Sequence, residues 1–455
     1  MLLGPKFQAF IEKSPVSVMV RGTLERVLHP DVLEELFNKH AIWQFTRNIT
    51  FAQCVQIMNA VVFKTQPSPG AWYELHGKEL SATRQAMYDK LKGIEPKVSA
   101  ALVHHAGKEL SCVRSMRGAP EDPLPGYRLR IVDGNHLTGT EHRLKGLRGT
   151  RAAALPGQAL VFYDPRCDLI TDAIPCEDAY TQERALLGQA LELITAKDCI
   201  LADRNFCTTN FLFGIAAKLS YFVIRQHASN LVRKLIGKLR EAGKDGQGRQ
   251  LMEQRMVLTD PSSGKKLHVR RITIPLPQGN DKGEKALYVL TNLPRKVSAV
   301  LVGDLYAKRW TIETAFQQLT DTLRTEIDTL AYPRAALFGF CLACVAYNVV
   351  SLVKAALRAT LGAEYVEAKL SMYYLTLEVA QVTRGMEIAI GEEEWRIFRS
   401  MSQEEFLATI LEVASRIQAE RYTKHKRGSK KPQPKKTSGK RHKHVSTARV
   451  LAGKQ

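Results

Sequence analysis

The sequence predicts a mixed α/β protein, in which an α/β core carries a β-rich insertion and is flanked by helical regions at both ends. Three observations support this class. Residues 127–226 begin with strand patterns and then alternate between helix and strand patterns. Residues 227–297 are rich in Lys, Arg and Gly, with β-like runs around turn signals. The segments on either side, 1–126 and 298–421, show mainly helical spacing of apolar residues.

Composition points to a nucleic-acid partner. The 66 Lys and Arg residues outnumber the 45 Asp and Glu residues, which gives a formal charge of +21. An excess of this size favours a polyanionic partner, and nucleic acid rather than a membrane surface. The longest apolar run, Ala335 to Val353, contains Asn348, so we expect a buried helix and no membrane span. The start of the chain lacks a signal-peptide pattern, so the expected location is the cytoplasm.

The eight cysteines are scattered along the chain. Cys341 and Cys344 have the spacing of half a zinc site, but they lie within the long apolar run and have no second pair. We therefore expect core thiols in a reducing compartment.

The N-terminal region, 1–126, offers one candidate for DNA contact. Ser81 to Leu91 reads as a short helix whose first turn carries Thr83, Arg84 and Gln85. These side chains could donate to phosphates and base edges in a groove. The same segment could equally be a packing helix of a small bundle.

Two acids follow predicted strands in the core. The strand-like run Tyr127 to Val132 ends at Asp133, and the apolar run Cys199 to Ala202 ends at Asp203. Buried strand ends hold carboxylates in fixed positions, as a metal site requires. An Asp directly after a strand can also be a turn former or a helix cap.

The order of elements between residues 127 and 226 is that of an RNase H-like core. After the first strand we expect a hairpin, a helix, the strand ending at Asp203, a second helix and a last strand: Gln158 to Tyr163 and Asp168 to Ile174, Thr181 to Ile194, Cys199 to Ala202, Thr208 to Lys218, and Tyr221 to Arg225. Such a core brings the ends of its first and fourth strands side by side. Asp164 and Asp172 are rival carboxylates, but their hairpin positions favour turn and edge roles.

A third acid lies on a two-striped helix predicted from Leu305 to Leu323. One stripe is apolar, and the other aligns Tyr306, Arg309 and Glu313 at steps of three and four residues. A carboxylate one turn beyond a guanidinium offers a cation ligand next to a phosphate clamp. The alternative is a surface ion pair on an ordinary amphipathic helix.

With these three acids, the chain resembles the DDE transposases of bacterial insertion sequences. More closely, it resembles the branch with a β-rich insertion and a Tyr-x2-Arg-x3-Glu-x6-Lys signature. The resemblance covers roughly Tyr127 to Gln226 and Ala286 to Leu357. Thr320 stands where that signature has its lysine, and Arg324, one turn further, is the candidate to replace its phosphate contact.

The resemblance implies a site and a cofactor. Asp133, Asp203 and Glu313 would hold two Mg²⁺ ions, for which Mn²⁺ could substitute. Hard oxygen ligands and the lack of a Cys or His cluster favour these ions over zinc. The expected contacts to the DNA phosphates come from a further set of residues: Tyr306, Arg309, Arg204 and Arg324.

The resemblance also implies a reaction and partners. The expected reaction is hydrolysis at the ends of the element, followed by attack of the freed 3′-hydroxyl on target DNA. The partners would be double-stranded terminal repeats and target DNA, bound by a homodimer on paired ends in the nucleoid of a bacterium. Related transposases that form a DNA hairpin stack a base on an aromatic residue of the insertion. Here Tyr288 is the only aromatic in 227–297 apart from the histidines, so the sequence does not support that route.

Two other functions stay open from the sequence. A metal-dependent nuclease on the same fold would cut DNA without joining it. A protein without catalysis would be either a decayed copy, with Thr320 as an early lesion, or a nucleic-acid chaperone.

The C-terminal part divides into three segments. Residues 298–360 would complete the core, and 361–421 would form helices that either mediate dimerisation or cover the sheet. Residues 422–455 contain many Lys, Arg and His residues and no acid. We expect a disordered tail that holds nucleic acid non-specifically, or else a solvated tail with no binding role.

Overall fold

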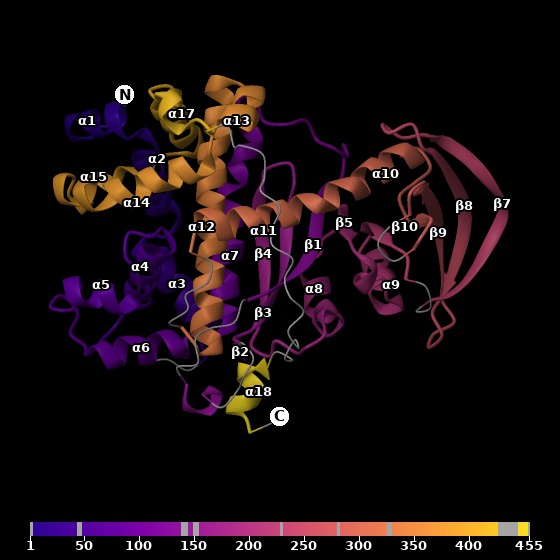
Figure 1. Ribbon diagram of the computed structural model, residues 1–455, viewed down its shortest axis with the longest axis horizontal. Helices are drawn as coiled ribbons and strands as arrows, with labels where there is room; N and C mark the ends of the chain where they lie inside the picture. The colour runs from indigo at the N-terminus through magenta and orange to yellow at the C-terminus, as the bar shows by residue number, and fades with distance from the viewer. Residues whose placement is uncertain are drawn as a thin grey trace.

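A single large sheet extends from a helical body to a projecting β-rich end, whose strands belong to the same sheet (Figure 1). The computed structural model describes residues 3–42, 48–137, 144–148, 154–227, 231–279, 283–324, 330–425 and 445–453.

The sheet has nine strands in the order β4-β3-β1-β5-β6-β10-β9-β8-β7 (Figure 1). Strands β1, β5 and β6 are parallel, and β3 and β4 form the predicted antiparallel hairpin beside β1. This arrangement confirms the predicted mixed α/β core. The core strands are β1 (Arg128–His136), β3 (Gln158–Asp164), β4 (Leu169–Cys176), β5 (Asp198–Ala202) and β6 (Tyr221–Arg225).

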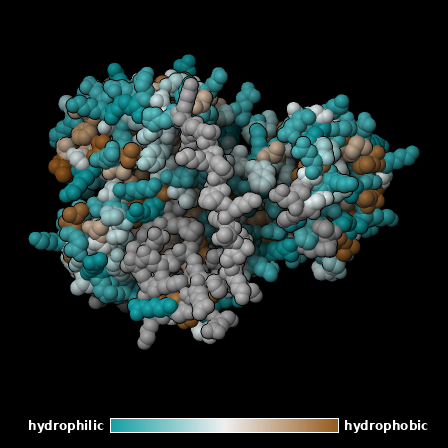
Figure 2. All heavy atoms as spheres, in the orientation of Figure 1, coloured by the Kyte–Doolittle hydropathy of each residue, from teal (hydrophilic) through white to brown (hydrophobic). Residues whose placement is uncertain are grey.

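The β-rich insertion continues this sheet, because β10 pairs antiparallel with β6. Its strands are β7 (Val232–Lys244), β8 (Gln250–Thr259), β9 (Lys266–Pro275) and β10 (Ala286–Thr291). β7, which the sequence did not indicate, is the edge strand and is exposed along most of its length. Figure 2 shows a mainly hydrophilic surface with hydrophobic residues on the outer side of the insertion, where Val232, Leu235 and Leu239 are exposed.

Helices cover both faces of the core. One face packs against α7 (Pro96–Glu109) and α12 (Pro333–Leu361), and the other against α8 (Leu187–Glu192) and α9 (Thr209–Ala217). Neighbouring strand residues point to opposite faces, so each strand contributes to both apolar clusters. The helix predicted for 181–194 is shorter than expected, because a 3₁₀ turn, η3 (Glu183–Leu186), precedes α8.

The helix predicted from Leu305 to Leu323 is a longer run in three pieces. It consists of α10 (Ala299–Ala307), the 3₁₀ turn η5 (Lys308–Trp310) and α11 (Thr311–Thr322). Figure 1 shows it lying across the sheet, with α10 at the insertion and α11 over the core. The predicted apolar stripe faces the protein interior, with Phe316 half-buried and four residues buried: Leu305, Ile312, Leu319 and Leu323.

The N-terminal and C-terminal helical regions pack against each other in one helical body. Glu378 of α14 accepts hydrogen bonds from the backbone and hydroxyl of Ser17 in α2, and Arg399 of α16 pairs with Glu25. The helices are α1 (Pro5–Lys13), α2 (Pro15–Val27), α3 (Pro30–His40), α4 (Phe51–Val62), α5 (Pro69–His76), α6 (Arg84–Gly93), α13 (Ala363–Lys369), α14 (Met372–Ala389), α15 (Glu392–Trp395), α16 (Ile397–Ser400) and α17 (Gln403–Ala414).

α12 runs through the middle of this body. Among the described residues it is the one helix long and apolar enough to cross a membrane, and its apolar window is wholly buried within the protein. Cys341 and Cys344 are buried free thiols on this helix, as predicted.

The N-terminal DNA-contact candidate begins later than expected. α6 starts at Arg84, and Thr83 rather than Ser81 caps it by accepting a hydrogen bond from the Ala86 amide at 3.2 Å. Arg84 pairs with Glu74 of α5 at 3.0 Å, and Gln85 donates to Asp89. These side chains therefore have partners on α5 and α6, and DNA contact by α6 stays a prediction.

The C-terminal tail is partly ordered, which corrects the prediction for 422–455. Tyr422 is buried and donates to Glu378. Further on, β11 (Val445–Ser446) pairs parallel with β2 (Ala154–Leu155), and α18 (Thr447–Leu451) follows it. The basic segment 426–444 lies outside the described residues.

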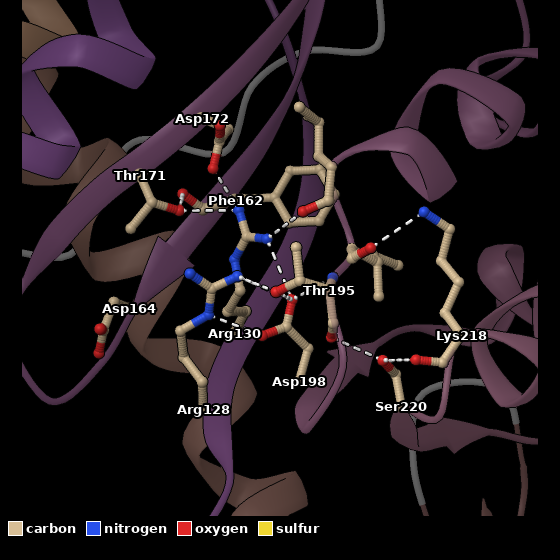
Figure 3. A network of polar contacts seen from close by, with 12 residues as sticks. Arg128, Arg130, Phe162, Asp164, Thr171, Asp172, Thr195, Asp198, Lys218 and Ser220 are labelled. Atoms are coloured by element: carbon tan, nitrogen blue, oxygen red, sulfur yellow. Dashed lines mark hydrogen bonds and ion pairs between the residues drawn. The ribbon is translucent and has the colours of Figure 1, made fainter.

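The rival acids of the hairpin have structural partners. Figure 3 shows Arg130 buried among Asp172, Thr171 and Asp198 and over the ring of Phe162, with its guanidinium carbon 4.3 Å from the ring centre. Asp164 pairs in the same way with Arg114 of the 3₁₀ turn η1 (Leu110–Ser115). The interpretation of Asp164 and Asp172 as structural residues is consistent with these contacts.

Candidate active site

Two of the predicted acids follow the paired part of two adjacent parallel strands. β1 and β5 pair in parallel, with Ile131 opposite Leu201. Asp133 and Asp203 each follow two residues later, so both side chains project to the face of Ile131 and Leu201. β1 continues to His136, so Asp133 lies within the strand and not after it as expected, although it is beyond the β5 pairing.

The helical run brings the third acid to the same face. α11 contacts β1, and its buried Ile312 belongs to the same apolar cluster as Ile131 and Leu201, which places α11 over this side of the sheet. The turn η5 connects Tyr306 on α10 to Glu313 on α11. The side chain of Glu313 is 46% exposed, so this carboxylate is open to solvent.

Arg309 connects these carboxylates. One guanidinium nitrogen donates to Asp133 Oδ2 at 3.1 Å and the other to Glu313 Oε1 at 3.3 Å. Burial lowers the pKa of Arg309, but Tyr306 and the three carboxylates outweigh burial, so the pKa of this guanidinium lies above its ordinary value. The fold therefore brings Arg309 and Asp133 together in one charged site, although they are 176 positions apart in the sequence.

Burial shifts two acidic groups of the site. It raises the pKa of Asp133 to about 6, against the opposing charge of Arg309, and the carboxylates of Glu183 and Glu313 add to the rise. Burial, reinforced by the charge of Asp203, raises the pKa of Tyr306 to about 12. Tyr306 is therefore a neutral hydrogen-bonding group at physiological pH.

A second cation, not predicted from the sequence, approaches Asp203. Arg225 ends β6, the parallel neighbour of β5, and its guanidinium lies 4.0 Å from Asp203 Oδ1. Arg225 also pairs with Glu284, which in turn lies 3.8 Å from Arg204. The predicted phosphate contact Arg204 is thus next to the site but paired with Glu284. Arg225 could have been found, because it ends a strand that the sequence indicated.

A fourth acid, Glu183 of η3, also escaped the sequence reading. Its carboxylate occupies the place where a Cβ on Gly134 would lie, and Asn205 donates to it at 3.4 Å. Glycine after Asp133 therefore leaves room for Glu183. No local pattern indicates this contact, because the two residues are brought together by the fold.

The remaining predicted residues point elsewhere. Arg324 donates to the carbonyl of Pro67, and its backbone amide donates to Val62 at 2.9 Å. These bonds engage Arg324 with the end of α4, which does not favour its replacing the signature lysine. Thr320 is exposed and donates to the Phe316 carbonyl of its own helix.

The donor chemistry of the site fits a hard divalent cation, because all three acids present carboxylate oxygens. Among the described residues, however, no three His, Cys, Asp or Glu side chains are grouped closely enough to hold a metal ion. Arg309 lies between two of the acids and shares their oxygens. The residues therefore match the ion by chemistry, while Asp133 and Glu313 are occupied with a guanidinium.

Comparison with known families covers this site. Residues 124–349 match the family model described as transposase DDE domain. The matched segment contains the core strands, the insertion, all three pieces of the helical run and the first half of α12. All three predicted acids lie within it. This match supports a transposase function.

The other comparisons add little. Among solved structures, the chain is similar to a piggyBac transposase synaptic complex with hairpin DNA, with a TM-score of 0.35 and 10% sequence identity over 91% of this chain and 78% of that chain. No curated protein matches the chain.

Proposed function

We propose that this protein is the transposase of a bacterial insertion sequence, which cleaves DNA at the ends of the element and joins those ends to target DNA. The observation that carries the proposal is the contact of Arg309 with both Asp133 and Glu313, next to Asp203 on the adjacent strand. Three acids from distant segments meet at one charged site within a segment that matches the transposase DDE domain.

In this proposal, Asp133, Asp203 and Glu313 hold Mg²⁺, with Mn²⁺ as a substitute. When bound, such ions lower the pKa of an attacking water and neutralise charge on the leaving oxygen. Tyr306 and Arg309 orient the scissile phosphate. Tyr306 donates as a neutral phenol, and Arg309 supplies a fork-shaped cation that suits phosphate oxygens.

The partners follow from charge and reaction. The net charge of +21 suits double-stranded DNA, both the terminal repeats and the target. Joining two ends to one target calls for two copies of the chain, so we expect a homodimer on paired ends, acting in the cytoplasm at the nucleoid.

A nuclease that cuts without joining is the second candidate. It is favoured by Thr320, which stands in place of the signature lysine, and by the engagement of Arg324 with Pro67. A strand-transfer assay separates the two functions.

The test is a Mg²⁺-dependent cleavage and strand-transfer assay on the DNA ends that flank the gene, with wild type and Asp203→Ala compared. Joined products from the wild type alone support the transposase. Cleaved but unjoined DNA supports the nuclease. Binding of the ends by both proteins, with cleavage by neither, contradicts both enzymes and identifies an inactive DNA-binding protein.

A further inference from the structure

Arg309 is a buried cation in contact with two of the three acids. Its side chain is only 7% exposed, and its two terminal nitrogens contact Asp133 and Glu313. The charge of Asp203 also acts on it. The single positive charge of the guanidinium therefore offsets part of the negative charge of the three acids.

The same oxygens that Arg309 holds are those that a divalent ion would need. Mg²⁺ binds carboxylate oxygens at roughly 2.1 Å and draws them around a common point. Here Asp133 Oδ2 and Glu313 Oε1 bond to different nitrogens of one planar group, at 3.1 and 3.3 Å. Both oxygens cannot bind the ion while the guanidinium lies between them.

Arg309 also has unused capacity for another anion. Its Nε is buried and has no hydrogen-bond partner within the described part of the chain. Its guanidinium carbon lies 4.5 Å from the ring centre of Trp310, whose side chain is 57% exposed. A phosphate entering beside Trp310 could accept bonds from Arg309 in place of the carboxylates.

We infer that Arg309 is an internal counter-cation that competes with the divalent ion for Asp133 and Glu313, and that DNA phosphate is the anion that releases it. Metal binding and DNA binding are then coupled, because each favours the rotamer of Arg309 that the other requires. By linkage, DNA raises metal affinity by the same factor by which metal raises DNA affinity. This inference rests on the proposed function, since it takes the three acids to be the metal site.

A merely structural ion pair makes a different prediction. If Arg309 only stabilised the fold, its removal would lower stability and leave metal affinity unchanged or weaker. If it acted only through long-range charge, then losing any nearby cation would have a similar effect. Lys308 is the matched control, because it is an exposed cation on the same 3₁₀ turn.

The experiment measures Mn²⁺ binding to the full chain without DNA, by electron paramagnetic resonance of the free ion. Arg309→Gln should bind Mn²⁺ about tenfold more tightly than wild type, the size of one lost charge-assisted hydrogen bond. Arg309→Lys keeps the charge but loses the fork, so its affinity should be intermediate. Lys308→Gln should match wild type. Circular dichroism without metal checks that each variant folds. If Arg309→Gln does not fold, the comparison of Arg309→Lys with wild type tests the inference.

A second measurement repeats the titration with a duplex carrying the DNA ends that flank the gene. The duplex should raise the Mn²⁺ affinity of the wild type and leave that of Arg309→Gln unchanged.

Two results would overturn the inference. The first is that Arg309→Gln and Arg309→Lys bind Mn²⁺ no more tightly than wild type. The second is that Lys308→Gln binds Mn²⁺ as tightly as Arg309→Gln does. The Asp133→Asn variant, which lacks one proposed metal ligand, distinguishes these two results from a failure of the proposed function. If no protein shows Mn²⁺ binding that Asp133→Asn removes, the metal site itself is wrong and the inference is lost with it.

Discussion

The charged side chains of the site differ in how far they are exposed to solvent. Asp133 and Arg309 are largely buried, with side chains 19% and 7% exposed, whereas Glu313 is 46% exposed. A change at Glu313 therefore removes a carboxylate from the site at little cost in packing. This makes Glu313 the residue at which chemistry and folding are most easily separated.

Glu313→Gln should abolish cleavage, by on the order of 10²–10³-fold or more, while leaving DNA-end binding intact. The amide keeps the shape of the side chain but cannot replace an anionic metal ligand. Asp321→Asn makes the same chemical change at an exposed position of α11 and should behave as wild type. Gel-shift and cleavage assays on the same DNA give both readouts. Equal losses of binding and cleavage would indicate that Glu313 is structural.

Local pattern indicated the candidate residues Asp203, Arg309 and Glu313, and only the fold revealed their further neighbours. Asp203 follows an apolar strand, and Arg309 and Glu313 lie four residues apart on a helical turn, so short-range periodicity was enough to find them. Glu183 reaches Gly134 from a position 49 residues further along the chain, and Glu284 reaches Arg225 from the insertion. Such contacts depend on strand order and register, which no short window of sequence contains.

At the scale of elements, α7 packs closely against β4 at Gly107. A Cβ on Gly107 would lie 2.8 Å from Thr171 Cα and 2.9 Å from its carbonyl oxygen. Both atoms belong to the backbone of β4, which cannot move aside as a flexible side chain can. Glycine here lets the helix approach the strand.

Gly107→Ala should lower the free energy of unfolding by about 1–3 kcal/mol, because helix and strand must separate. Gly385→Ala is the matched control, since Gly385 is in α14 with open space around it. That change should stabilise the protein by roughly 0.5–1 kcal/mol. Urea unfolding of the three proteins measures both effects. A Gly107→Ala protein as stable as wild type would contradict the close packing of α7 on β4.

Sequence patterns predicted most of the helices and strands, but they missed one strand and one 3₁₀ turn. The core strands follow apolar runs, and Tyr221 to Arg225 was predicted with its observed bounds. β7 was missed because it is exposed on both faces and lacks an alternating pattern. The turn η5 was missed because Lys308, Arg309 and Trp310 have no sequence signal against a regular helix.

At the scale of the whole molecule, the N-terminal helices are joined to helices that follow the core. Glu25 of α2 is 7% exposed and pairs with Arg21 on its own helix and with Arg399 of α16. Burial by itself raises the pKa of Glu25, but the two guanidinium groups outweigh it and hold this pKa below its ordinary value of 4.5. Ionised Glu25 thus favours the folded state.

Glu25→Gln should destabilise the protein at pH 7 by about 1–3 kcal/mol, the size of hydrogen bonds to a charged group. A lowered carboxyl pKa contributes stability above its unfolded value, and this contribution is lost as the pH falls through the folded pKa. The difference in melting temperature between wild type and variant should therefore shrink toward pH 3. A difference that is constant from pH 7 to pH 3 would contradict the account of this ion pair.

The basic C-terminal segment should add to non-specific DNA binding. Residues 426–444 contain nine Lys and Arg residues and no acid. Each phosphate that such a residue neutralises steepens the fall of affinity with salt by about 0.9 in a double-logarithmic plot. Truncation after His425 should weaken binding to random duplex DNA and flatten this slope, as fluorescence anisotropy at several salt concentrations would measure. An unchanged slope would mean that the segment is only solvated.

The central claim is that Asp133, Asp203 and Glu313 hold one divalent-metal site. Fe²⁺ also accepts oxygen ligands, and with ascorbate and peroxide it generates radicals that cut the nearby backbone. Mass spectrometry of the fragments should locate cuts beside all three residues in wild type, with Mg²⁺ suppressing them and Glu313→Gln losing them together. Cuts at other segments, or cuts beside only one of the three residues, would contradict the account.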